Sequence, residues 1–157
     1  MSGQIEEIYV TDKPAGELLS AKEVQIDAGK GIVGDRYYGK SPDDQITLVD
    51  AGVIDQVNAA TGWQITPAET RRNVITRGID LNQFETSQFR LGNAILEGVE
   101  LCEPCAILGR ILQTEERSGA QVVQALTHKA GLRARILQGA VIRCGDTLSP
   151  LDDGLDK

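Results

Sequence analysis

Glycine spacing is the feature of this sequence that most constrains its fold. The pattern Gly-x-x-Ile-x-x-Gly-x-x-Leu occurs twice, in residues 92–101 and 139–148. Each copy predicts a strand, a glycine turn and a second strand, because glycine permits the sharp corners that a small, curved sheet needs. Two copies are too few for a repeat protein. We therefore predict a mainly β fold, a largely antiparallel barrel with short helices inserted between its strands.

Apolar residues at alternate positions predict the strands of this barrel. The segments expected to form strands are 4–11, 21–26, 45–49, 73–76, 89–91, 93–101, 132–137 and 140–148. Two helices are predicted from their ends. Asp50 is expected to cap a helix that Gly62 terminates, and Thr66 with Pro67 and Glu69 is typical of the start of a short helix.

Two more helical segments are expected in the second half of the chain. Residues 106–117 are amphipathic and Gly119 interrupts the pattern. Val122, Val123 and Leu126 then predict a further helical piece, which Gly131 is expected to end.

The chain length of 157 residues favours one domain, expected over residues 1–150 and followed by an acidic tail at 151–157. No run approaches the roughly 18 apolar residues of a membrane helix. The first residues lack the basic and apolar segments of a secretory signal. Three cysteines, two of them in one CxxC, do not make a disulfide framework, so we expect a protein of the reducing cytoplasm.

The net charge of −7 disfavours general binding to nucleic acid or to anionic membranes. The charge is unevenly spread, however. Residues 71–145 carry ten basic and seven acidic side chains, a net charge of +3 inside an acidic protein. This excess is either chance variation or a local site for a small anion, such as a phosphate-bearing cofactor.

The sharpest chemical motif is the CxxC pair Cys102 and Cys105, with Glu103 and Pro104 between them. A predicted strand precedes the pair and a predicted helix follows it, which would place Cys105 near a helix N-terminus. Backbone N–H groups and the helix dipole lower a thiol's pKa there, and a thiolate is both a nucleophile and a soft metal ligand. Glu103 opposes this effect because a nearby carboxylate disfavours a second anion. We predict that Cys105 carries the chemistry.

Other interpretations of the CxxC pair stay open. A structural zinc site needs about four N/S ligands, and the other sources are Cys144 and the single histidine, His128. A dithiol redox site of the thioredoxin kind would need an early βαβ unit, whereas this pair comes late in a β-rich chain. Both cysteines could also simply pack in the core as small apolar residues.

Several cations are candidates for binding an anion, since guanidinium groups match phosphate and carboxylate geometry. Each of them, taken alone, could equally be an ordinary surface residue. Because consecutive arginines on a helix point to different faces, we expect at most one of Arg71 and Arg72 to reach a site. No GxGxxG or GxxxxGK[ST] motif supports classical nucleotide binding. The candidates are Arg71, Arg72 and the adjacent Asn73, together with Arg36, Lys129 and Arg133.

Several segments, taken together and in this order, are similar to those of one known family. They are GDRY at 34–37, QITL at 45–48, RRNVITRGIDL at 71–81, GNAILEG at 92–98, CEPC at 102–105, and the stretch from GLRA at 131 to GD at 145–146. They span nearly the whole chain, which resembles a MOSC domain, the molybdenum cofactor sulfurase C-terminal domain. The resemblance implies a barrel of the type found in a pyruvate kinase domain, in a standalone MOSC protein.

The resemblance also implies a cofactor and a site. In the family, a cysteine is thought to bind the molybdenum of molybdopterin or to carry sulfur destined for it, and the second cysteine of the pair corresponds to Cys105. The arginine-rich segments of the family lie near the cofactor, which implicates Arg71, Arg72 and Asn73, together with Arg36. Lys129 and Arg133 are further cofactor-binding candidates, and Cys102 has a secondary role. Descriptions of the family that mention pyridoxal phosphate refer to a fused aminotransferase-like domain, of which this sequence shows no trace.

We therefore expect a molybdenum-cofactor-binding protein that acts either as a small reductase of N-hydroxylated compounds or as a sulfur or cofactor carrier. Its partners would be the small-molecule cofactor and substrate, together with a redox or cofactor-biosynthesis protein. Neither nucleic acid nor a membrane is expected among them. The alternatives are a non-enzymatic module that binds an anion or cofactor, and a dithiol redox protein that uses the CxxC pair.

Overall fold

The computed structural model describes residues 2–104 and 106–151, and these residues build a closed β-barrel. Seven strands follow one another around it in the order β1, β11, β7, β8, β9, β5 and β6, and β2 extends the edge at β1. A separate three-stranded sheet has the order β10-β3-β4. The strands are β1 (Gly3–Val10), β2 (Leu19–Ala21), β3 (Glu23–Asp27), β4 (Gly31–Ile32), β5 (Ile46–Asp50), β6 (Val74–Arg77), β7 (Gln88–Leu91), β8 (Ala94–Leu101), β9 (Leu132–Gln138), β10 (Ala140–Arg143) and β11 (Thr147–Pro150).

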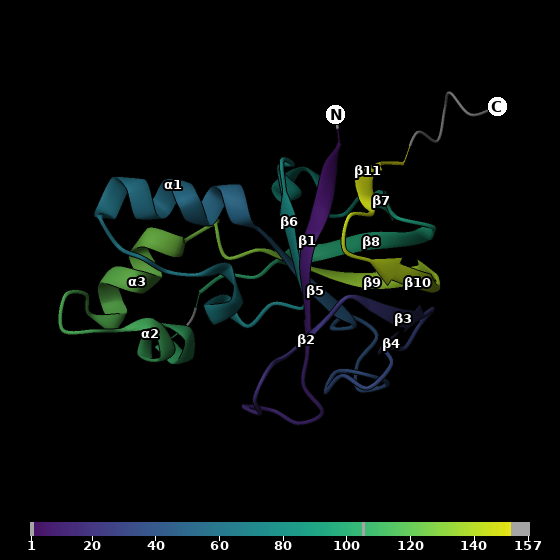
Figure 1. Ribbon diagram of the computed structural model, residues 1–157, viewed down its shortest axis with the longest axis horizontal. Helices are drawn as coiled ribbons and strands as arrows, with labels where there is room; N and C mark the ends of the chain where they lie inside the picture. Colours follow the sequence, from purple (N-terminus) through teal and green to yellow (C-terminus); the bar gives the residue numbers. More distant parts are fainter. Residues whose placement is uncertain (1, 105, 152–157) are drawn as a thin grey trace.

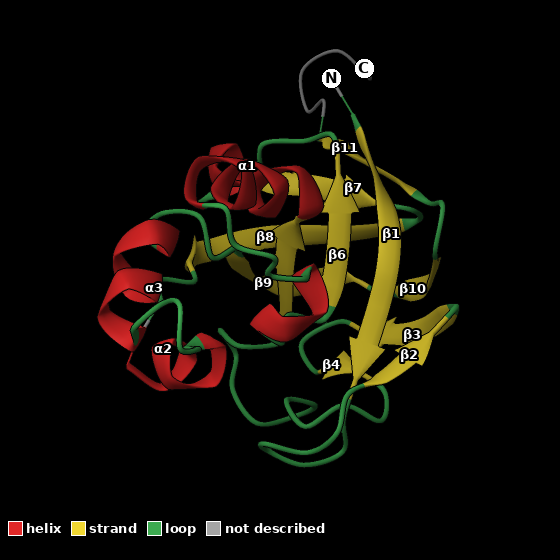
Figure 2. Ribbon diagram, turned by 60° about the vertical axis from the view of Figure 1, so that its left-hand side comes forward, coloured by secondary structure: helices red, strands yellow, loops and turns green. Residues whose placement is uncertain are grey.

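The three α-helices gather on one side of the barrel, while β3, β4 and β10 lie on the other (Figures 1 and 2). None of the described helices combines the length and apolar composition that a membrane-spanning helix requires. The helical elements are α1 (Ala51–Thr61), α2 (Ala106–Leu112), α3 (Gly119–Leu126) and two 3₁₀ turns, η1 (Pro67–Thr70) and η2 (Leu81–Phe84).

Most neighbouring strands are antiparallel, as expected, but β5 and β6 are parallel and pair Leu48 with Val74. Parallel neighbours need a crossover connection, and α1 with η1 supplies it. The predicted ends of α1 are confirmed: the Asp50 carboxylate accepts from the Gly52 N–H at 3.1 Å, and Gly62 ends the helix with φ +79°. Asp50 therefore both completes β5 and starts the crossover.

Strand β5 has a core on each face, because the helices cover its outer side. Leu48 points into the barrel with Val74, whereas Val49 points outward with Ile75 into a second core against the helices. A strand that is buried on both faces carries a continuous apolar run rather than an alternating one. This arrangement fixes the helices against the barrel wall near the ends of β5 and β6.

Some predicted boundaries were wrong, and tertiary contacts explain why. The helix expected over 106–117 ends at Leu112, because the chain then folds back and the Arg117 Nε donates to the Leu112 carbonyl at 2.6 Å. Helix α3 begins at Gly119, where Ser118 caps it, and ends at Leu126, before Gly131. The strands expected over 21–26 and 140–148 are each interrupted, at residue 22 and at residues 144–146, where the chain passes between sheets.

The two glycine patterns also differ in their roles. Gly145 lies in a turn with φ +95°, as expected of a corner. Gly98, in contrast, lies inside β8 and makes no turn. A Cβ atom there would lie 1.9 Å from the Phe84 carbonyl oxygen, and the Thr86 N–H donates to the Gly98 carbonyl at 3.0 Å. Gly98 is therefore required because the segment after η2 passes directly over the strand.

A buried asparagine joins three strands at one end of the barrel. The Asn73 Oδ1 accepts from both the Thr47 N–H and the Thr47 hydroxyl, each at 3.1 Å, and its Nδ2 donates to the Tyr9 carbonyl at 3.1 Å. The Asn73 backbone N–H donates to the Thr47 Oγ1 at 3.0 Å, and its carbonyl accepts from the Tyr9 N–H at 2.7 Å. With an exposed fraction of 0%, Asn73 links β1 and β5 to the start of β6.

Substitution of Gly98 tests the close approach over β8. We expect Gly98→Ala to lower the free energy of unfolding by about 3 kcal/mol or more, because a backbone oxygen must move to admit the methyl group. Gly29→Ala is the control: its site is open but has φ +71°, so we expect about 1–2 kcal/mol. Urea denaturation measures both, and equal losses would contradict the steric explanation.

Substitution of Asn73 tests the three-strand link. Asn73→Ala leaves buried backbone groups of β1 and β5 without their partner, so we expect a loss of about 2–4 kcal/mol in the free energy of unfolding. Gln124→Ala removes an amide from an exposed position on α3 and should change stability by less than about 0.5 kcal/mol. A loss in Asn73→Ala as small as in this control would show that the link is dispensable.

Candidate functional site

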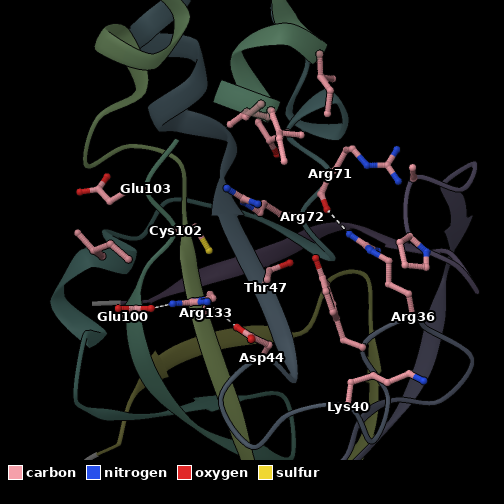
Figure 3. A pocket seen from close by; sticks show the side chains of 18 of the residues that line it. Arg36, Lys40, Asp44, Thr47, Arg71, Arg72, Glu100, Cys102, Glu103 and Arg133 are labelled. Carbon is pink, nitrogen blue, oxygen red and sulfur yellow. Dashed lines mark hydrogen bonds and ion pairs between the residues drawn. The ribbon is translucent and has the colours of Figure 1, made fainter. Parts of the chain in front are cut away.

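A large pocket of about 1020 Å³ lies between the end of the barrel that Asn73 joins, helix α2 and the loops before β2 and β5. Its lining combines cations with apolar side chains. Figure 3 shows side chains from several separate segments directed into it, among them Arg72, Thr47 and Cys102. The cations that line the large pocket are Arg36, Lys40, Arg71, Arg72 and Arg133.

Two of these cations are already compensated by carboxylates. Arg133 pairs with Asp44 at 2.8 Å and also contacts Glu100. Arg36 pairs with the buried Asp35 at 3.3 Å and stacks on the Tyr37 ring, with 4.3 Å between its Cζ and the ring centroid. A guanidinium held by a carboxylate offers little charge to a further anion.

Arg71 and Arg72 differ from these two, since among the described residues only carbonyl oxygens accept from their guanidinium groups. The Arg71 Nη2 donates to the Gly16 carbonyl at 2.8 Å, and the Arg72 Nε donates to the Ala130 carbonyl at 2.8 Å. Carbonyls orient a guanidinium without cancelling its charge. Among the arginines of the large pocket, Arg71 and Arg72 are therefore the two whose charge no carboxylate of the described residues compensates.

The expectation that at most one of Arg71 and Arg72 reaches a site was wrong, because both line the large pocket. The reason is local. Arg71 ends η1 with φ +64°, in the left-handed region, so the chain turns sharply between η1 and β6. Figure 3 shows the two side chains extending in opposite directions from this turn, and both still reach the lining of the pocket. The Arg36 Nη2 donates to the Arg71 carbonyl at 3.1 Å and supports this strained residue.

Cys102 lines the large pocket but is largely buried, with an exposed fraction of 7%. Its N–H donates to the Gly131 carbonyl at 2.8 Å, which fixes it beside β9. Burial raises the pKa of the Cys102 thiol to about 11, and Asp44 and Glu103 act in the same direction, whereas Arg72 opposes them. Cys102 is therefore a protonated thiol at neutral pH in the structure as it stands.

Glu103 ties the segment after Cys102 to the loop between α3 and β9. Its Oε1 accepts from the His128 N–H at 2.7 Å, and its Oε2 lies 2.5 Å from the His128 Nδ1. His128 adopts φ +62°, so this contact holds a backbone conformation that is uncommon for a side-chain-bearing residue. Together with the Cys102 N–H bond, it anchors the start of the CxxC segment to the barrel.

Not every predicted site residue lies in the large pocket. Asn73 is buried behind it, and Lys129 lines a second, smaller pocket of about 280 Å³ together with Asp50 and His128. Burial raises the pKa of Asp50, although its hydrogen bonds to Thr76, Ile79 and Gly52 oppose the shift. Cys105 lies outside the described residues, although Glu103 and Ile107 on either side of it in the sequence line the large pocket.

The structure adds residues that the sequence did not single out. Lys40, Thr47 and the exposed isoleucines of α2, Ile107 and Ile111, all line the large pocket. Thr47 stands within the QITL segment, but nothing in a single sequence shows that its hydroxyl meets Asn73. Among the described residues, no group of three His, Cys, Asp or Glu side chains lies close enough to hold a metal ion, so Cys102, Cys144 and His128 do not come together as the zinc interpretation would need.

Comparison with known proteins places this fold. The MOSC domain model matches residues 35–149. The structure resembles the YuaD protein from Bacillus subtilis, with a TM-score of 0.83 and 20% identity over 94% of each chain. It also resembles YiiM from Escherichia coli (TM-score 0.70, 16% identity, 95% of this chain and 70% of that one). For YiiM from Geobacillus stearothermophilus the TM-score is 0.69 and the identity 18%, over 98% of this chain and 77% of that one.

At these identities the solved structures show a shared fold and no more. A comparison with curated proteins found no match. The predicted barrel with short inserted helices is confirmed as the MOSC type. The family match covers most of the chain and spans the segments that build the large pocket. MOSC domains are generally linked to binding of the molybdenum cofactor. This chain belongs to the MOSC domain family.

Proposed function

We propose that this protein binds the molybdenum cofactor in the large pocket and uses it to reduce small N-hydroxylated compounds. One observation carries the proposal. Arg71 and Arg72, the two arginines of the pocket lining without a carboxylate partner among the described residues, both line a cavity of about 1020 Å³ that is large enough for a cofactor and a substrate. The family match supports the choice of cofactor, and the two arginines support a phosphate site within the pocket.

The residues present fit such a cofactor at its anionic end. A phosphate needs charged donors in a fixed geometry, and Arg71 and Arg72 offer free guanidinium N–H groups that are oriented by the carbonyls of Gly16 and Ala130. Arg36 would act on the phosphate indirectly, because it supports the Arg71 backbone. Arg133 contributes less, since Asp44 and Glu100 already pair with it.

Binding of the cofactor also requires a soft donor atom for its metal. Cys102 is a weak candidate as it stands, because its raised pKa keeps the thiol protonated. We therefore propose Cys105 as the molybdenum ligand, with Cys102 as a neighbouring thiol whose ionisation would depend on Arg72. When bound, the cofactor supplies a redox centre that can exchange two electrons.

The proposed reaction cleaves an N–O bond. The compound R–NH–OH gains two electrons and two protons, the nitrogen becomes R–NH₂, and the oxygen leaves as water. The electrons come from an external protein donor that carries a redox group such as a flavin, haem or iron–sulfur centre. The chain's own residues would hold and orient the cofactor: the cations bind its anionic end, and the apolar side chains of α2 limit the access of water to the site.

Molybdenum content tests the proposal directly. We expect near-stoichiometric molybdenum in protein made in a host that synthesises the cofactor, measured by elemental analysis with pterin fluorescence. The Arg71→Gln/Arg72→Gln variant should retain at most about one tenth of the molybdenum of the wild type. Each lost charged hydrogen bond weakens binding by roughly 1.5–3 kcal/mol. Arg143→Gln is the matched control, since that arginine lies on β10 and pairs with Glu23, outside the pocket lining.

Cysteine variants separate the possible roles of the site. Loss of molybdenum in Cys105→Ala but not in Cys102→Ala supports the assigned ligand. Equal retention by wild type and the Cys102→Ala/Cys105→Ala variant would instead indicate a non-enzymatic binding module. Full molybdenum content without reduction of any N-hydroxylated compound, under a supplied electron donor, would point to a sulfur or cofactor carrier.

The pH dependence of alkylation tests the state of Cys102. Burial raises the pKa of the Cys102 thiol from 9.0 to about 11. We therefore expect iodoacetamide to label Cys102 in the folded protein at pH 8 about a hundredfold more slowly than in the urea-denatured chain. The rate should rise about tenfold per pH unit up to about pH 11, and Arg72→Gln should slow it further. Peptide mass spectrometry follows each thiol, with the exposed Cys144 as internal reference.

A labelling rate for Cys102 that levels off below pH 9 would show a low thiol pKa and contradict this account. It would also favour the dithiol redox alternative, which needs a ready thiolate. A thiol count under mild oxidant then decides that alternative, because a working dithiol must convert reversibly to a disulfide.

A further inference from the structure

Two large apolar side chains of α2 face solvent within the large pocket. Ile107 is 60% exposed and Ile111 is 49% exposed, and both line the cavity. Residues four apart lie one above the other on the same side of a helix, so the two isoleucines form one continuous apolar strip. The other large apolar side chains that the described structure leaves exposed, Leu19, Val33 and Leu137, are outside the pocket lining.

The exposed strip belongs to a firmly held helix. On the opposite face of α2, Leu108 and Leu112 are buried in the core that the helices share with β5 and β6. Helix α2 also touches the start of α3 closely, since a Cβ atom at Gly109 would lie 2.7 Å from the Gly119 carbonyl oxygen. The isoleucines are thus presented by a fixed element and are not exposed through fraying of a helix end.

The apolar and the cationic parts of the lining come from different segments of the chain. Leu101 at the end of β8 joins Ile107 and Ile111 to form an apolar wall, whereas Arg71 and Arg72 belong to the segment between η1 and β6. The acidic residues Glu100 and Glu103 lie within two residues of Leu101 and also line the pocket, but Glu100 is paired with Arg133 and Glu103 contacts His128. The apolar wall suits an uncharged body, and the arginines suit an anion.

The size of the strip indicates a small molecule as its occupant. Protein partners in stable complexes cover about 800 Å² on each side, far more than two isoleucine side chains expose. The isoleucines instead face a concave space of about 1020 Å³, which is the scale of cofactor and small-ligand sites. Exposed apolar surface inside such a cavity marks a place where a ligand removes it from water.

We propose that the apolar wall formed by Leu101, Ile107 and Ile111 is the substrate subsite, and that it binds the uncharged aromatic or aliphatic body of the substrate. The inference rests on the proposed function in one respect, namely that the arginine side is taken by the cofactor. It specifies the substrate class as apolar-bodied small molecules and selects against nucleotides, sugar phosphates and other charged compounds. It also explains why a reductase suits this pocket better than a carrier, which would have no use for a second apolar subsite.

Binding of N-phenyl-1-naphthylamine, an uncharged aromatic fluorophore, tests the subsite. We expect the purified protein to bind one molecule with enhanced fluorescence, and Ile107→Gln/Ile111→Gln to weaken binding about tenfold. Leu19→Gln/Leu137→Gln, which alters leucines of similar exposure outside the pocket, should leave binding unchanged. Ile107→Val/Ile111→Val keeps both positions apolar and should retain most of the binding. A loss in this variant as large as in the glutamine variant would indicate a general effect of altering α2.

Unchanged binding in Ile107→Gln/Ile111→Gln, or an equal loss in the control variant, would overturn the proposal. So would sedimentation that shows a self-association lost in the glutamine variant, because the strip would then be an interface between copies of the chain. Arg71→Gln/Arg72→Gln separates this proposal from the proposed function. That variant should lose molybdenum yet bind the uncharged fluorophore as wild type does, so either proposal can fail while the other stands.

Discussion

The large pocket depends on one buried amide. Asn73 is the point where β1, β5 and the start of β6 are held together, and it bonds to groups of both Tyr9 and Thr47. Arg71 and Arg72 precede it directly in the chain, so the anchor of the barrel wall is also the anchor of the two arginines. A residue that looks like a cofactor ligand in the sequence thus acts, in the structure, as the fixed base from which the ligand-binding residues extend.

Pairing decides which cations of the pocket can bind an anion. A count of positive charges would treat Arg36, Arg133, Arg71 and Arg72 alike. The structure divides them, because Asp35, Asp44 and Glu100 neutralise the first two while carbonyl oxygens hold the others. The same polypeptide that carries a net charge of −7 therefore presents a small, localised positive site beside an apolar wall. This contrast is the physical basis for assigning cofactor and substrate to different sides of one cavity.

Local sequence chemistry was enough to predict the barrel, the position of most strands and the ends of α1, because alternation, the Asp50 cap and Gly62 act over a few residues. It failed where contacts between distant segments determine the local structure. The early end of α2 follows from the return of Arg117 to Leu112, and the approach of both Arg71 and Arg72 follows from a left-handed residue after η1. Lys129 faces a different pocket for a similar reason, since the turn at His128 is held by Glu103, 25 residues away. Cys105 stays a prediction from motif and family alone.

Closure of the barrel joins segments from opposite ends of the chain. Gly3 of β1 pairs with Leu148 of β11, so the last gap in the wall is sealed by residues that the ribosome adds late. Contacts of such long sequence separation form slowly, and the nascent chain carries open strand edges until they do. The proposed binding of the cofactor would thus follow closure of the barrel. Until β11 takes its place, the edges of β1 and β7 that it covers are open to pairing with another chain.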